Sequence, residues 1–114
     1  PKSKGEVITS ESADRITKLM IQAVEQGEAK WAAPKGYVVA GKTGTAQIAV
    51  EGHYDAEKTI ASFVGFAPAN NPKFVMIVKL SEPQTSQWAA ETAAPLWFDI
   101  AKKLLLRYNI APSN

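Results

Sequence analysis

A short stretch of the chain, Gly41–Thr45, holds one ammonium group and two hydroxyl groups between glycines. Thr43 and Thr45 are two residues apart, so their side chains lean to the same face of a β-strand. Two such hydroxyls can hold one carboxylate, and Lys42 can bind an anion or assist the proton transfers of a serine. Glycine inside a strand often marks a close approach, so we expect Gly44 to let a ligand lie against the backbone. The stretch therefore predicts a site for a carboxylate, where a free backbone N–H could stabilise an oxyanion.

This site makes a geometric demand on its strand. Strict alternation sends Lys42 to the face opposite the two threonines. All three side chains can serve one site only if the strand is twisted or if the site lies along its edge. A short motif also arises by chance, so the alternative interpretation is a strand with a solvated lysine.

Three strands are predicted, at about 37–47, 60–67 and 73–81, and the first carries the motif. A tight turn at Pro68–Pro72 joins the last two, which are therefore expected to pair as an antiparallel hairpin. The polar segment 51–58 is expected to form a hairpin tip or a surface loop. Because the last two strands are apolar at nearly every position, the sheet should be covered on both faces.

Two helices are expected to flank the sheet, at about 10–26 and about 90–108. The first has an apolar stripe at helical spacing, a hydroxyl cap at Thr9 or Ser10, and Gly27 as its stop. The second also has an apolar stripe, and Pro95 fits it only within the first turn. Two helices on one face would leave the other face bare, and one helix on each face would cover the sheet thinly, so in either case this α+β arrangement is expected to need more protein.

Composition excludes several classes of function. The net charge of +2 has no block of like sign, so no nucleic-acid or membrane-surface binding is expected. Without cysteine there can be no disulfide and no thiolate metal site. No apolar run approaches the ~20 residues of a membrane helix. The chain begins with Pro1 rather than Met, and we therefore expect it to be a piece of a longer protein.

The single histidine and the three tryptophans are expected to have structural or surface roles. His53 is the only histidine, and its polar surroundings predict a place on the surface rather than in a metal site. The three tryptophans, Trp31, Trp88 and Trp97, are expected to serve packing rather than to form platforms for a ligand.

The segment Val39–Gln47 resembles the third signature of the penicillin-binding proteins, the K-T-G box that accompanies S-x-x-K and S-x-N. Ala61–Pro68 resembles the strand that follows the box in this family, and Ala93–Trp97 resembles the start of its C-terminal helix. The resemblance runs from Ile8 to Tyr108, and the Thr-Ala-Gln ending of the box points to the class B, monofunctional transpeptidases. It implies that residues 1–114 are the C-terminal portion of a transpeptidase domain, within a larger α/β/α sandwich.

The resemblance also implies roles by position. Lys42 would hydrogen-bond with the middle serine of the family and set the electrostatics of the cleft. Thr43 and Thr45 would hold the carboxylate of a D-alanyl-D-alanine stem peptide or of a β-lactam, and the Thr45 N–H would form half of the oxyanion hole. Gly44 and Gln47 would also contact the substrate, so Lys42 and Thr45 are the catalytic candidates. The implied reaction is acyl transfer through a serine ester, without a metal or cofactor.

The chain departs from the family pattern because it has no S-x-x-K and no S-x-N. The nucleophilic serine, its lysine partner and the middle serine would therefore come from the remainder of the transpeptidase domain, and the chain alone is expected to be inactive. The other expected partners are the peptidoglycan stem peptide and a β-lactam. The parent protein is expected to be membrane-anchored, on the extracytoplasmic face of the bacterial cytoplasmic membrane.

Two alternatives stay open. One is a non-catalytic module on the same scaffold that recognises a peptide carboxylate, and the undercovered sheet counts against it. The other is a β-lactam sensor or β-lactamase domain that uses the same box, and Ala46-Gln47 after Thr45 makes it less favoured.

Overall fold

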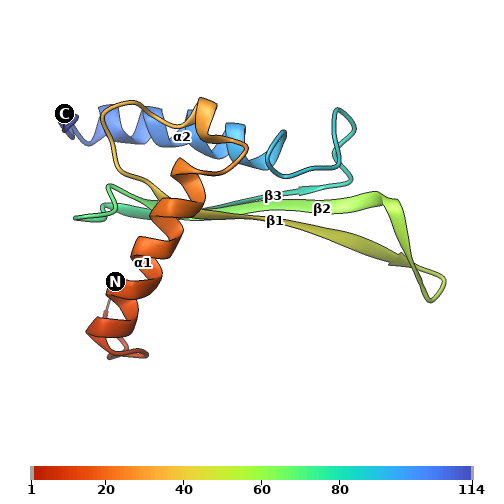
Figure 1. Ribbon diagram of the computed structural model, residues 1–114, viewed down its shortest axis with the longest axis horizontal. Coiled ribbons are helices and arrows are strands. Elements are labelled where there is room, and N and C mark those ends of the chain that lie inside the picture. The colour runs from red at the N-terminus through yellow and green to blue at the C-terminus, as the bar shows by residue number, and fades with distance from the viewer. Residues whose placement is uncertain (1, 114) are drawn as a thin grey trace.

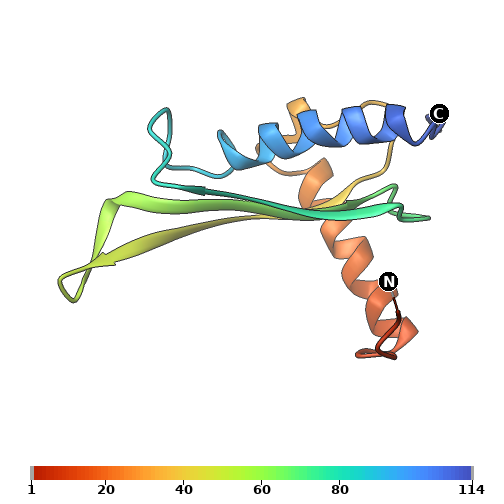
Figure 2. The same cartoon turned by 180° about the vertical axis from the view of Figure 1, so that it is seen from behind.

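The computed structural model describes residues 2–113. Its elements are α1 (Ser10–Glu25), the short 3-10 helix η1 (Lys30–Ala32), β1 (Ala40–Val50), β2 (His53–Ala67), β3 (Phe74–Ser81) and α2 (Ala93–Arg107). The strands form one antiparallel sheet in the order β1-β2-β3. Helix α2 lies along one face of the sheet, whereas α1 passes the sheet beside β1 and projects beyond the opposite face (Figures 1 and 2). The predicted α+β arrangement is confirmed.

The β1–β2 hairpin is longer than the sequence predicted. Segment 51–58, expected to be a tip or loop, is mostly strand, and only Glu51 and Gly52 form the turn. Both turn residues have positive φ, at 50° and 82°, which suits the tight turns of twisted hairpins. The pairing shifts register after Gln47, and residues 56–58 have no partner in β1. Polar side chains are compatible with this strand pair because the ribbon extends beyond β3 into solvent (Figure 1).

The helix ends follow the residue types that the sequence offers. Thr9 caps α1, and its Oγ1 accepts a hydrogen bond from the Ser12 N–H at 3.1 Å. A Cβ on Gly27 would lie 2.3 Å from the Ala23 carbonyl oxygen, so a glycine is needed where the chain leaves α1. Helix α2 begins at Ala93, three residues after the predicted start, and Pro95 therefore falls in its first turn, where a missing N–H costs no helical bond.

The core lies between α2 and the sheet. The Phe63 ring of β2 packs against Trp97 and Phe98, with ring centroids 5.0 and 5.2 Å apart. Trp97 is fully buried, and its Nε1 donates to the Met76 carbonyl at 2.9 Å, which satisfies its one polar group. This packing confirms the structural role predicted for Trp97. It also fixes β2 and β3 beneath α2.

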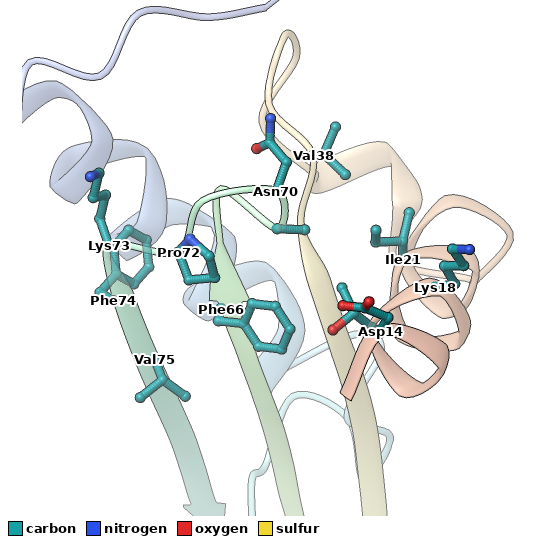
Figure 3. A pocket seen from close by; sticks show the side chains of 12 residues that line it. Asp14, Lys18, Ile21, Val38, Phe66, Asn70, Pro72, Lys73, Phe74 and Val75 are labelled. Carbon is teal, nitrogen blue, oxygen red and sulfur yellow. The ribbon is translucent and has the colours of Figure 1, made fainter. Parts of the chain in front are cut away.

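The opposite face of the sheet is largely bare within the described residues. Val75 and Ile77 of β3 are 74% and 65% exposed, and Val64 of β2 is 40% exposed. A hollow of about 840 Å³ separates this face from α1, with Ile21 on one side and Phe66 on the other (Figure 3). The apolar strands thus have one covered face and one open face, so the described residues supply the predicted cover on one side only.

The prediction that all three tryptophans serve packing is wrong for two of them. Trp31 of η1 is 73% exposed and Trp88 is 54% exposed, because each lies in a connecting segment outside the core. Among residues 2–113, no helix has the length and apolar character needed to cross a membrane.

Candidate functional site

The K-T-G stretch lies on an edge strand, since β1 pairs only with β2 among the described residues. The carbonyl oxygens of Ala40 and Gly44 lie on the β2 side, where Ala40 approaches Gly65 and Gly44 accepts a bond from Ser62 Oγ at 3.4 Å. In an antiparallel pair, successive residues direct their N–H and C=O groups alternately toward the partner strand and away from it. Thr45 follows Gly44, so its backbone N–H and C=O face the open edge.

Lys42 reaches this edge from the other face of the sheet. It is in register with Val64, whereas Thr43 is in register with Phe63, so alternation separates the two side chains as the sequence predicted. The Lys42 Nζ nevertheless donates to the Thr43 carbonyl oxygen at 3.0 Å and to Thr43 Oγ1 at 3.4 Å. The Lys42 side chain therefore bends around the edge of β1, and its ammonium group lies beside the Thr43 hydroxyl.

Thr45 has a hydrogen-bond partner that the sequence did not reveal. The backbone N–H of Ala89, in the segment before α2, donates to Thr45 Oγ1 at 3.0 Å. A hydroxyl has one proton to donate and two lone pairs that accept. With one acceptor position occupied, the exposed Thr45 hydroxyl can still donate its proton to a ligand oxygen. A backbone N–H is present at almost every residue, so no residue type signals this contact.

The two glycines of the motif face different surroundings. A Cβ on Gly41 would lie 2.3 Å from Phe63 Cζ, so this glycine lets a core ring pack across β1. A Cβ on Gly44 would meet only Ser62 Oγ, at 2.9 Å, on the face that Lys42 shares. Gly41 therefore has a structural role, while the expected role of Gly44 in admitting a substrate stays a prediction.

Two hollows adjoin the motif. The first, of about 250 Å³, includes Lys42, Thr43 and Thr45 in its lining, together with the end of α1 and the segment before α2. The second, of about 600 Å³, is lined by Thr45, Gln47 and residues of the β2 ribbon. The structure thus brings Lys42 and both threonines together in the first hollow, whereas Gln47 lies in the second. Trp88 lines both hollows, although the sequence had assigned it to packing.

These features define an antiparallel sheet with flanking helices and a K-T-G motif on its open edge. Comparison with known proteins identifies the family to which this arrangement belongs. The family model of the penicillin-binding protein transpeptidase domain matches residues 1–105. The chain belongs to this family. Among curated relatives, it is 36% identical to stage V sporulation protein D of Bacillus subtilis over 113 residues, and 33% identical to a probable peptidoglycan D,D-transpeptidase PenA of Neisseria flavescens over 116 residues.

Solved structures agree with this assignment. The transpeptidase domain of penicillin-binding protein 3 from Burkholderia pseudomallei superposes with a TM-score of 0.88 at 34% identity, covering 100% of this chain and 35% of that one. Penicillin-binding protein 3 from Mycobacterium tuberculosis, solved with ampicillin, gives a TM-score of 0.83 at 31% identity and covers 94% of this chain and 26% of that one. The matches to the two curated relatives cover 98% and 100% of this chain but only 18% and 29% of the relatives.

Proposed function

We propose that this chain supplies the carboxylate-binding and oxyanion-hole strand of a peptidoglycan D,D-transpeptidase. A serine outside the chain attacks the carbonyl of a D-alanyl-D-alanine stem peptide, D-alanine leaves with a proton, and a serine ester forms. An amine of a second stem peptide then takes the acyl group and releases the serine. A β-lactam acylates the same serine by opening its ring. Membership of the family and the similarity to a probable peptidoglycan D,D-transpeptidase support this assignment.

One observation carries the proposal: an ammonium and two hydroxyls lie along one open strand edge. Lys42 Nζ is within 3.4 Å of Thr43 Oγ1, and Thr45 Oγ1 is left with a proton to donate. An ionised carboxylate only accepts hydrogen bonds, and it is bound more strongly where one of the donors is positively charged. The outward Thr45 N–H would polarise the scissile carbonyl as one half of the oxyanion hole.

The bare face of the sheet supports a partner for this chain. Val75 and Ile77 leave an apolar surface of a kind that small proteins rarely expose to water. We assign the cover of this face to the remainder of the transpeptidase domain, which would also bring the nucleophilic serine to the site. Because its substrate is peptidoglycan, the parent protein would act outside the cytoplasmic membrane.

Labelling with a fluorescent penicillin tests the proposal. The full-length protein that contains this chain should form a covalent adduct, whereas residues 1–114 alone should form none. Thr45→Val should slow labelling of the full-length protein by about tenfold or more, because it removes a hydrogen bond to a charged group. Thr45→Ser keeps the hydroxyl and should label at close to the original rate. Labelling of residues 1–114 alone would contradict the assignment of the nucleophile.

A non-catalytic binding module is the second candidate, since Lys42, Thr43 and Thr45 all lie within this chain and the nucleophile does not. It predicts that a peptide ending in D-Ala-D-Ala binds the full-length protein without forming an ester. Titration of that peptide, followed by mass spectrometry of the protein, separates the two functions. Binding that Thr45→Val abolishes, with no acyl adduct from either peptide or penicillin, would favour the binding module.

A further inference from the structure

Among residues 2–113, Thr59 is the one polar residue that is buried, with 2% of its surface exposed. It lies on β2 in register with Gln47, two residues before Ala61, which is in register with Thr45. Alternation therefore places Thr59 and Ala61 on the same face of β2, beside Thr45. Residues this buried are seldom polar unless they make a specific hydrogen bond.

The hydroxyl of Thr59 holds the segment that crosses this end of the sheet. Its Oγ1 donates to the Gln87 carbonyl oxygen at 2.8 Å, and its own carbonyl accepts from the Glu82 N–H at 2.8 Å. The segment is thus attached to β2 at two points, five residues apart in its sequence. One of these bonds, the one to Gln87, depends on the side chain.

Two residues after Gln87, the same segment reaches the K-T-G motif. The Ala89 N–H donates to Thr45 Oγ1 at 3.0 Å, and the Ala89 carbonyl accepts from the Ala94 N–H at the start of α2, at 2.9 Å. Ala89 is 1% exposed. The position of its N–H is therefore held from both sides, by Thr59 through Gln87 and by α2.

We propose that Thr59 is a positioning residue of the carboxylate site. By holding Gln87, it keeps the Ala89 N–H on Thr45 Oγ1, so that the Thr45 hydroxyl is set to donate its proton outward to an acceptor-only ligand such as a carboxylate. This inference rests on the function proposed above. It adds a second strand and the segment 82–92 to a site that the motif alone confines to β1.

The test compares penicillin G with its methyl ester in the full-length protein that contains this chain. The ester lacks the negative charge, so the ratio of the two acylation efficiencies reports on carboxylate recognition. Thr59→Val removes the hydroxyl at nearly constant volume, and the ratio should fall by about tenfold, with the loss confined to the acid. Thr59→Ser should retain most of the ratio.

Two controls separate positioning from general damage. Thr17→Val removes a hydroxyl bond to the Ala13 carbonyl, at 2.8 Å within α1, and should leave the ratio unchanged. In a Thr45→Val background, Thr59→Val should have little further effect on the ratio, because the two residues act through one hydrogen bond. If Thr59→Val fails to fold, Thr59→Ala removes the same hydroxyl with fewer new contacts. It then replaces Thr59→Val both in the single variant and in the Thr45→Val background.

The outcomes are distinguishable. If the wild-type protein reacts equally with acid and ester, the proposed carboxylate site is wrong. If the wild type prefers the acid and Thr59→Val leaves that preference intact, or slows acid and ester equally, the positioning role is overturned. Additive effects of Thr59→Val and Thr45→Val would overturn it as well.

Discussion

The two faces of the sheet differ although the same strands make both. On the covered face, Phe63 packs with Trp97 and Phe98 beneath α2, and all three side chains are buried. On the open face, Val75 and Ile77 are apolar but mostly exposed. The contrast shows that, within the described residues, the chain packs a core on one face of its sheet and leaves the other face bare. The K-T-G motif lies where the two faces meet, at the open edge of β1.

This position explains why the motif draws on both faces. Thr45 projects on the covered side, where Ala89 fixes its hydroxyl, while Lys42 starts on the open side and reaches Thr43 around the edge. Residues of this chain build the covered side, so contacts within the chain position the threonines. The middle serine expected to bond to Lys42 would come from outside the chain.

The largest expected effect comes from the covered face. Trp97→Ala should lower the free energy of unfolding of the chain by about 3–5 kcal/mol, because it leaves a cavity and removes the bond to the Met76 carbonyl. Leu96→Ala, at the neighbouring and 41% exposed position, should cost about 1 kcal/mol or less. Urea denaturation measures both. Equal losses would show that α2 is not the cover that closes this face.

The open face should respond to its surroundings. Ile77→Ala should change the stability of residues 1–114 by no more than about 0.5 kcal/mol, as is usual for exposed sites. In the full-length protein, where we propose that the face is covered, the same change should cost about 2–4 kcal/mol. Denaturation of both proteins, each with and without the substitution, gives the comparison. A small loss in the full-length protein would mean that the face stays exposed.

The two motif glycines offer a test within β1. Gly41→Ala should destabilise the chain by about 1–3 kcal/mol, since the added Cβ would overlap the Phe63 ring on the covered face. Gly44→Ala, which meets only the Ser62 hydroxyl on the open face, should cost less than Gly41→Ala. Thermal unfolding followed by circular dichroism ranks the two variants. The reverse order would show that Phe63 moves aside more easily than Ser62.

The smallest expected effect concerns charge at the edge. Glu28 lines the same hollow as Lys42, and its exposed carboxylate should weakly repel a carboxylate ligand. Glu28→Gln should raise acylation of the full-length protein by penicillin about twofold at low salt, and the gain should fade as salt screens the charge. Glu25→Gln, in the last turn of α1 but outside the lining of that hollow, is the matched control. An equal gain from both variants would point to net charge rather than to the site.

Much of the site could be predicted from the sequence because its signals are local. Apolar spacing placed both helices, and the spacing of Thr43 and Thr45 put two hydroxyls on one face of a strand. The K-T-G box, with the strands and helix around it, led to the family that the comparisons then showed. The predicted ends of β1 and β2 are wrong because polar residues can also pair as strands, in a hairpin whose two faces are both exposed to solvent.

The sequence by itself determined the elements, which depend on residue type and short-range period, and the motif, whose resemblance to the K-T-G box indicated the class of protein. Only the tertiary structure decided how Lys42 reaches Thr43, which N–H meets Thr45, and which face of the sheet is covered. These depend on strand register and on contacts between residues far apart in the chain, such as Ala89 with Thr45 and Gln87 with Thr59. A backbone N–H or C=O carries no residue-specific signal, and it is folding that assigns each one its partner.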